Sequence, residues 1–271
     1  AGATGVMQYP APTLIVDQGA VVTVNLTNAL PGAAGNVSLV FPGHEVITTG
    51  GAAGLLTAEA VPGGGVSYQF TANRPGTFVY HSGTRPDLQI EMGIGGVLIV
   101  RPTAGSVICP GSQQAAYDHV GSCYDREYLF YLGEIDTDVH MAVAAQMAGA
   151  SPLIVSLEPY DPEFWLINGR GAPDTMAAAT VAGTGVTPHQ PYNALARMHP
   201  GERVLLRVVG GGREMHPFHH HGNHARVIAR DAHVLANAGG FLVGPNVFTT
   251  TVVPGGTADG IWEWTGERLG W

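Results

Sequence analysis

The chain has 271 residues, a formal net charge of −9 and 12 basic residues, all of them arginine. Without a basic stripe, the composition argues against a nucleic-acid partner and against a polybasic membrane patch. No apolar run reaches the roughly 18 residues of a membrane-spanning helix, so we expect no membrane span. The length fits one large domain or two small ones, and the 39 Gly and 19 Pro predict many turns between short strands.

Short strands separated by Gly and Pro turns fill the first hundred residues. Apolar and polar residues alternate with a period of two at Val66-Ser67-Tyr68-Gln69-Phe70, the pattern of a half-buried strand. We expect strands at residues 13–16, 21–26, 37–41, 66–70, 76–81 and 95–100. This spacing is typical of a β-sandwich or barrel, and Arg101-Pro102 ends the unit.

The strand pattern restarts after a connector, which indicates two tandem β-domains. Further strands are expected at residues 127–132, 164–167, 203–209, 224–230, 248–253 and 260–264. One helix is expected at Asp138–Gly149, with Gly149 as its stop. The predicted fold is all-β, with domain 1 at residues 1–104, the connector at 105–127 and domain 2 at 128–271.

Two cysteines, Cys109 and Cys123, lie in the connector among turn residues. They could supply a thiolate metal ligand, but an even number of cysteines in a processed chain favours a disulfide that closes a surface loop. Because the chain starts at Ala1 without Met, we expect a mature chain in an oxidising, extracytoplasmic compartment.

Five of the 12 histidines lie between His216 and His224, in the segment His216-Pro217-Phe218-His219-His220-His221-Gly222-Asn223-His224. Neutral imidazole is a favoured ligand for copper, zinc and iron. In an extended segment His219 and His221 share one face and His220 points away, whereas His216 can serve another site. We therefore expect metal binding by His216, His219 and His221, with His224, His220 and His81 as secondary candidates. Glu214, Asn223 and Asp231 are close enough in sequence to orient the imidazoles.

The segment His216-Pro217-Phe218-His219-His220-His221-Gly222 resembles the His-Pro-x-His-x-His-Gly motif of multicopper oxidases. That resemblance implies cupredoxin domains, which are Greek-key β-sandwiches, and copper as the cofactor. It implies that His216 is a ligand of the mononuclear type 1 copper, and that His219 and His221 are type 2 and type 3 ligands. In the first half, Pro75-Gly76-Thr77-Phe78-Val79-Tyr80-His81 is similar to a strand of the same family.

The chain departs from the family pattern at several positions. Ser82 follows His81 where the nitrite-reductase branch has a copper-binding Cys, and residues 37–41 hold no His where the oxidases have a ligand pair. His44 is expected to be a loop histidine. The family continues after a strand such as Ile261-Trp262-Glu263-Trp264 with a His-Cys-His strand, so domain 2 is expected to be incomplete here. Such a chain is the N-terminal part of a longer protein, a degenerate member, or a protomer that a partner completes.

Three functions remain open. The first is an extracytoplasmic multicopper oxidase that oxidises a small reductant or metal ion and reduces O₂ when complete. The second is a non-catalytic copper-binding cupredoxin, and the third is a structural or assembly subunit with decayed sites. Completion is expected from a further segment of the same protein or from another subunit, and a homo-oligomer is possible. Glu134, Asp136 and Asp138 alternate at a strand end and are expected to form a solvated strand edge.

Overall fold

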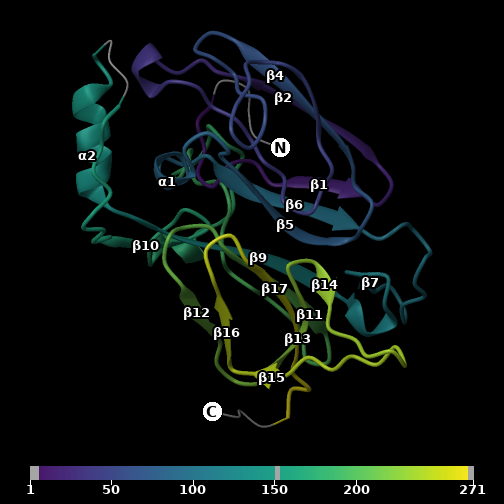
Figure 1. Ribbon diagram of the computed structural model, residues 1–271. Coiled ribbons are helices and arrows are strands. Elements are labelled where there is room, and N and C mark those ends of the chain that lie inside the picture. The colour runs from purple at the N-terminus through teal and green to yellow at the C-terminus, as the bar shows by residue number, and fades with distance from the viewer. Residues whose placement is uncertain (1–5, 150–152, 268–271) are drawn as a thin grey trace.

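The computed structural model describes residues 6–149 and 153–267, and it shows two β-rich lobes, with the first half of the chain above the second in Figure 1. The strands of the first half are β1 Leu14–Asp17, β2 Val21–Thr27, β3 Ile47–Gly50, β4 Gly65–Thr71, β5 Gly76–His81 and β6 Gly95–Arg101. They form two three-stranded sheets, ordered β2-β4-β3 and β1-β6-β5. The all-β sandwich expected from the sequence is confirmed.

The core of the first half lies between these two sheets. Alternate residues of β4, which are Val66, Tyr68 and Phe70, are buried, as the period of two requires. They pack with Phe41 and Leu98 in one apolar cluster. Strands β5 and β6 are buried along nearly their whole length, because their other face packs against the second half of the chain.

The second half is built on a seven-stranded sheet. Its strands are β9 Arg126–Ile135, β10 Phe164–Ile167, β11 Arg203–Gly210, β13 Ala225–Arg230, β14 His233–Val234, β15 Asn246–Val247 and β17 Thr257–Glu263. The order is β10-β9-β11-β17-β13-β14, with β15 paired to β13. A separate pair, β12 His216–His219 and β16 Thr249–Val252, packs Phe218 and Val252 into the same apolar cluster as the sheet.

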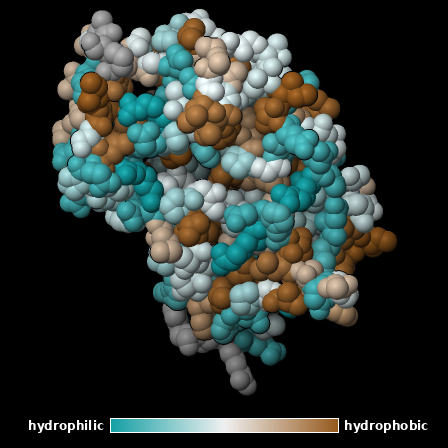
Figure 2. Space-filling view, viewed as in Figure 1, coloured by the Kyte–Doolittle hydropathy of each residue, from teal (hydrophilic) through white to brown (hydrophobic). Residues whose placement is uncertain are grey.

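Helices are few among the described residues. The helix α2 spans Thr137–Gln146 and stands at the side of the molecule in Figure 1, so the helix expected at Asp138–Gly149 is confirmed with slightly different ends. The helix α1 spans Pro86–Gln89, and three 3₁₀ turns lie at Gly32–Ala34, Val120–Ser122 and Asp174–Met176. No described helix is long and apolar enough to cross a membrane. Figure 2 shows polar and apolar residues mixed over the visible face, which agrees with a charged content of only 12%.

One expected strand is wrong. Residues 37–41 form only isolated bridges, from Val37 to Ala60 and from Val40 to His81, although Val37, Leu39 and Phe41 are buried. The segment is apolar because its side chains fill the core. A run of apolar residues is also typical of a buried strand, so the sequence pattern does not separate the two cases. Conversely, the short strand β3 escapes the pattern, since three of its four residues are exposed.

The two halves meet at a buried polar cluster. Arg207 on β11 lies 3.2 Å from Asp259 on β17 and 3.0 Å from Glu127 on β9. Thr77 on β5, in the first half, is 2.8 Å from the Asp259 carboxylate, and the Tyr117 hydroxyl donates to the same carboxylate at 2.6 Å. Burial alone would lower the pKa of Arg207, but the carboxylates of Asp259 and Glu127 outweigh it and raise that pKa. The three charges thus hold one another in place within the large sheet, and Thr77 and Arg101 of the first half bond to them. We call this contact between the halves the seam.

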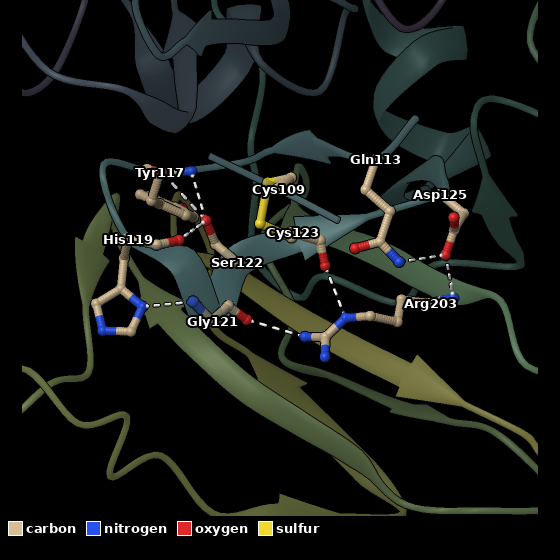
Figure 3. Close-up of a disulfide and its surroundings, with 9 residues drawn as sticks. All are labelled: Cys109, Gln113, Tyr117, His119, Gly121, Ser122, Cys123, Asp125 and Arg203. Atoms are coloured by element: carbon tan, nitrogen blue, oxygen red, sulfur yellow. Dashed lines mark hydrogen bonds between the residues drawn. A yellow bond between two sulfur atoms is a disulfide. The ribbon is translucent and has the colours of Figure 1, made fainter. Parts of the chain in front are cut away.

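The connector carries the expected disulfide, Cys109–Cys123, beside the short strands β7 Gln114–Ala115 and β8 Cys123–Tyr124 (Figure 3). Arg203, at the start of β11, donates from Nε to the carbonyl of Cys123 at 2.8 Å and from Nη2 to that of Gly121 at 3.0 Å. The disulfide loop is thus fastened to the sheet of the second half. The cysteine pairing predicted from the sequence is confirmed.

Candidate metal centre

The histidine motif begins on β12, which runs antiparallel to β16 with His216 opposite Val252 and His219 opposite Thr249. His216 is buried and Phe218 is half-buried, whereas Pro217 and His219 are exposed, as alternation along a strand requires. Phe218 packs against Phe130 of the large sheet, with the ring centroids 4.6 Å apart and the rings tilted. His216 and His219 therefore lie on opposite faces of their strand, which separates the expected ligands into two groups.

The first group is the pair His219 and His221. Their ring centroids lie 5.0 Å apart in an edge-to-face arrangement, and both residues are exposed. Nδ1 of His219 hydrogen-bonds with the hydroxyl of Thr249 at 2.9 Å. The structure thus brings together the two imidazoles that the sequence assigns to one face, and their role as ligands stays a prediction.

The neighbours of this pair have other surroundings. Both ring nitrogens of His220 are buried and have no hydrogen-bond partner among the described residues, and burial lowers its pKa. The ring of His224 lies 3.7 Å from that of Phe248, so it packs on an aromatic surface. Neither contact points to a shared ligand set with His219 and His221.

The second group is His216 and a residue that the sequence does not suggest. Nε2 of His216 lies 2.8 Å from a carboxylate oxygen of Glu134 on β9, and the side chains are 10% and 0% exposed. Burial by itself would raise the pKa of Glu134, but the hydrogen bonds from His216 and from the backbone of Arg213 and Glu214 lower it. Trp165 on β10 packs edge-on against the His216 ring at 5.4 Å.

The expectation that Glu134, Asp136 and Asp138 form a solvated strand edge is wrong for the first two. Glu134 and Asp136 are 2% and 3% exposed, and only Asp138 faces solvent. Asp136 is the N-cap of α2, since its Oδ1 accepts from the backbone of Asp138 at 2.9 Å and of Val139 at 3.3 Å. An Asp just before a predicted helix was the signal for this role.

The residues proposed from sequence to orient the imidazoles have other contacts. The side chain of Glu214 is exposed, and only its backbone N–H reaches Glu134. Asn223 donates to the carbonyl of Glu263 at 2.7 Å, and Asp231 accepts from the backbone of Thr257 at 2.8 Å. Glu134 holds the position that these three were expected to hold, and it lies 82 residues away along the chain.

The histidines of the first half lie apart from the motif. His81 ends β5, and its Nδ1 hydrogen-bonds with the carbonyl of Ser82 at 2.9 Å. The ring of His44 sits between Phe70 and Phe78, at 4.7 and 4.6 Å, and burial lowers its pKa. These packing contacts agree with the expectation that His44 is a loop histidine.

A thiolate ligand is missing from the described residues. Ser82 is buried and donates to Oε1 of Gln89 at 2.6 Å, and both cysteines are in the disulfide. Within residues 6–149 and 153–267, no three His, Cys, Asp or Glu side chains are grouped to hold a metal ion. A type 1 copper does not fit these residues alone, whereas the pair His219 and His221 offers two ligands of a copper site.

An apolar cavity of about 400 Å³ adjoins the motif. His220 and His221 line it together with Phe218 of β12 and with Trp262 of the large sheet. Its other walls come from Phe130, Ala194, Ala196, Arg197, Met198, Val204, Leu206 and Trp264. The cavity marks a part of the large sheet that β12 and β16 leave uncovered.

Comparisons with known proteins agree with this description. Residues 4–105 match the family model described as multicopper oxidase. The chain is 29% identical over 181 residues to an L-ascorbate oxidase of Cucurbita pepo var. melopepo, covering 64% of this chain and 28% of the relative. It is 30% identical over 190 residues to a copper-containing nitrite reductase of Alcaligenes xylosoxydans xylosoxydans, covering 65% and 52%.

Among solved structures, the blue copper oxidase from Nitrosomonas europaea superposes with a TM-score of 0.64 at 20% identity, over 94% of this chain and 66% of that chain. This likeness shows a shared cupredoxin-like fold. The matched part of this chain covers about a quarter to two thirds of the length of these three proteins.

Proposed function

We propose that this chain is the copper-binding part of a multicopper oxidase-type oxidoreductase, because residues 4–105 match the multicopper oxidase family model. When its ligand set is complete, the protein oxidises a small reductant or a metal ion and passes the electrons to O₂. Copper supplies the one-electron redox chemistry when bound, and the chain holds and orients it. The names of the relatives suggest ascorbate as one candidate reductant.

The observation that carries this proposal is the pairing of His219 and His221 in the motif. Two exposed imidazoles with centroids 5.0 Å apart, at the end of β12 and just after it, offer two nitrogen ligands of a kind that copper prefers. Within residues 6–149 and 153–267, no third His, Cys, Asp or Glu side chain is grouped with this pair, so the proposal includes ligands from elsewhere. A further segment of the same protein or another subunit, including a second copy of the chain, would supply them.

An extracytoplasmic location fits the chemistry of the connector. The connector contains the Cys109–Cys123 disulfide. Disulfides form and persist in oxidising compartments and are rare in reducing ones. We therefore propose a periplasmic, cell-surface or secreted protein.

Three features favour a second candidate, a non-catalytic copper-binding or assembly subunit. Ser82 stands in the place of a thiolate, residues 37–41 carry no His, and both cysteines are in the disulfide. A chain with these features binds copper without forming a blue centre by itself. Its copper would be stored, delivered or completed elsewhere.

A Cu(II) titration of the metal-free chain tests the proposed ligands. We expect His219→Ala and His221→Ala to lower the affinity, and His220→Ala, the matched control from the same segment, to change it little. Full affinity in the first two variants, with a loss in the third, would refute the assignment of the faces. If none of the three changes binding, the motif is not the copper site of this chain.

Oxygen uptake separates the two candidate functions. The copper-loaded chain is incubated with ascorbate or Fe(II), and O₂ consumption is followed together with visible absorption. The oxidase proposal requires uptake that disappears in His219→Ala, in the complete protein if not in residues 1–271. Copper binding without uptake in the complete protein favours the non-catalytic subunit. A strong band at about 600 nm in the 271-residue chain would contradict the missing thiolate.

A further inference from the structure

The cavity beside the histidine motif has a floor of aromatic and aliphatic side chains from three neighbouring strands. Val204 and Leu206 are alternate residues of β11 and therefore face the same side of the sheet. Trp262 of β17 lies opposite Val204 in the strand register, and Phe130 comes from β9 on the other side of β11. The volume of about 400 Å³ lies within the roughly 300–1,000 Å³ of apolar sites that hold small molecules.

One wall of the cavity is the irregular segment before β11, residues 194–198, and the fold holds this segment in place. The Tyr128 hydroxyl donates to the carbonyl of Arg197 at 2.6 Å and accepts from its backbone N–H at 2.9 Å. Ala194 donates from its backbone to the carbonyl of Thr175 at 2.8 Å. The wall is therefore formed before any ligand arrives, which lowers the ordering cost of binding.

The polar part of the lining is basic. Among the described residues it includes the exposed Arg197 and two histidines but no Asp or Glu, although the chain has 21 acidic residues. Arg197 forms no ion pair within residues 6–149 and 153–267. An unpaired guanidinium beside an apolar cavity favours an anionic group on the ligand. A carboxylate is the planar partner that arginine can bind with two parallel hydrogen bonds.

His220 is a second polar group that lines the cavity. Both of its ring nitrogens are buried and have no hydrogen-bond partner among the described residues. The backbone of Asn223 is near the ring but makes no hydrogen bond with these nitrogens. Buried polar groups are nearly always paired, so the unpaired nitrogens of His220 favour a ligand that brings a hydrogen-bonding atom.

We propose that this cavity binds a small aromatic acid. The flat ring of the ligand lies against Phe218 and Trp262, where contacts between aromatic rings add to the burial of apolar area. The carboxylate bonds to Arg197, and His220 contributes a further hydrogen bond to the ligand. Binding needs no copper, so this inference goes beyond the proposed oxidase function and does not depend on it.

Isothermal titration calorimetry of the metal-free chain with 2-naphthoate is the direct test. We expect binding with a negative change in heat capacity, which is the sign of apolar burial. 2-Naphthylmethanol has the same two rings without the charge. It should bind about 10-fold more weakly, because a hydrogen bond to a charged group is lost.

The indole N–H signals of tryptophan locate the bound ligand. Trp262 and Trp264 line the cavity, whereas Trp165 on β10 is not part of its lining. In ¹H–¹⁵N spectra, naphthoate is therefore expected to shift the signals of Trp262 and Trp264 and to leave that of Trp165 in place.

Four variants assign the roles in binding. Arg197→Gln should remove the preference for naphthoate over naphthylmethanol and keep the binding of the alcohol. Arg230→Gln, which removes an equal charge from an exposed side chain of β13, is the matched control. His220→Phe keeps an aromatic ring and should bind naphthoate about 10-fold more weakly. Ala196→Trp should fill the cavity and abolish binding of both ligands. Urea unfolding checks that each variant is folded, and the exposed Arg197 keeps the test usable if Ala196→Trp does not fold.

The proposal is overturned if naphthoate does not bind, or if the unmodified chain and Arg197→Gln bind both ligands equally well. Shifts confined to Trp165 would also overturn it. So would binding by the 271-residue chain that is absent from the complete protein, because another segment then fills the cavity. Since the titration is done without copper, a failed copper titration at His219 and His221 would refute the proposed function and leave this site standing.

Discussion

The two halves of the molecule differ in how completely their β-sheets are covered by other parts of the chain. In the first half, two three-stranded sheets enclose an aromatic core that includes Phe41, Tyr68 and Tyr80, each at most 5% exposed. In the second half, a seven-stranded sheet is faced by β12 and β16, and a cavity of about 400 Å³ lies beside them. The histidine motif belongs to the less completely covered half. The candidate metal ligands therefore lie in the half whose core is less completely packed.

The largest expected effect comes from removing the buried cation of the seam, Arg207, which also bonds to Thr77 of the first half. In Arg207→Met, Asp259 stays buried without its ion-pair partner, whereas Glu127 keeps its pair with Arg101. Removing one partner of a buried ion pair costs about 3–5 kcal/mol, because an uncompensated charge stays behind. Urea unfolding of the variant measures this loss of free energy of unfolding.

Arg126→Met is the control for that experiment. Arg126 pairs with Glu202 at 2.6 Å on the partly exposed rim of the same sheet, where water screens the charges. We expect a much smaller loss than in Arg207→Met. Equal losses in the two variants would mean that the buried Arg207 pairs contribute no more to stability than a partly exposed ion pair.

A pair of core truncations compares the two halves directly. Leu98→Ala in the closed core should cost about 3 kcal/mol, since it leaves a cavity in well-packed surroundings. Leu206→Ala, beside the existing cavity, should cost about 2 kcal/mol, because that side chain already lacks some contact atoms. The midpoints of urea unfolding, at an unchanged denaturant slope, give both values. An equal or larger loss in Leu206→Ala would contradict the contrast between the halves.

The smallest effect concerns the pH dependence of the seam. Burial raises the pKa of Glu127, but the pairing with Arg207 and Arg101 outweighs it, so the folded pKa lies below the ordinary value of 4.5. A lowered folded pKa stabilises the fold above the ordinary value, and this stabilisation is lost as the pH falls through the folded pKa. In Glu127→Gln, stability measured from pH 6 to pH 3 should fall less steeply than in the unmodified chain. An identical slope would show that Glu127 does not couple to folding.

Local patterns explain how much of this structure the sequence could predict. Strong alternation or apolar runs flanked by Gly and Pro mark β4, β5, β6 and β11 correctly, and an Asp before an apolar helix marks α2. The disulfide follows from the pairing of two cysteines. These features depend on neighbours in the chain, so a sequence is enough to find them.

Contacts between distant residues were the part that sequence patterns missed. Glu134 and His216 are brought together because β9 and β11 pair in parallel and the loop at Gly212 leads from β11 to His216. Residues 37–41 look like a strand because burial and pairing leave the same apolar signature. The separation of His216 from His219, in contrast, was predictable from the period of two once the segment was taken to be extended.

The seam also limits how the two halves can be exchanged during evolution or engineering. Thr77 comes from the first half, whereas Asp259 and Arg207 come from the second, and the three side chains bond to one another in the interior. A chimera joined near residue 104 to a second half without these partners would bury polar atoms that nothing satisfies. Recombination at this boundary is therefore expected to yield folded protein only when Thr77, Arg207 and Asp259 are inherited together.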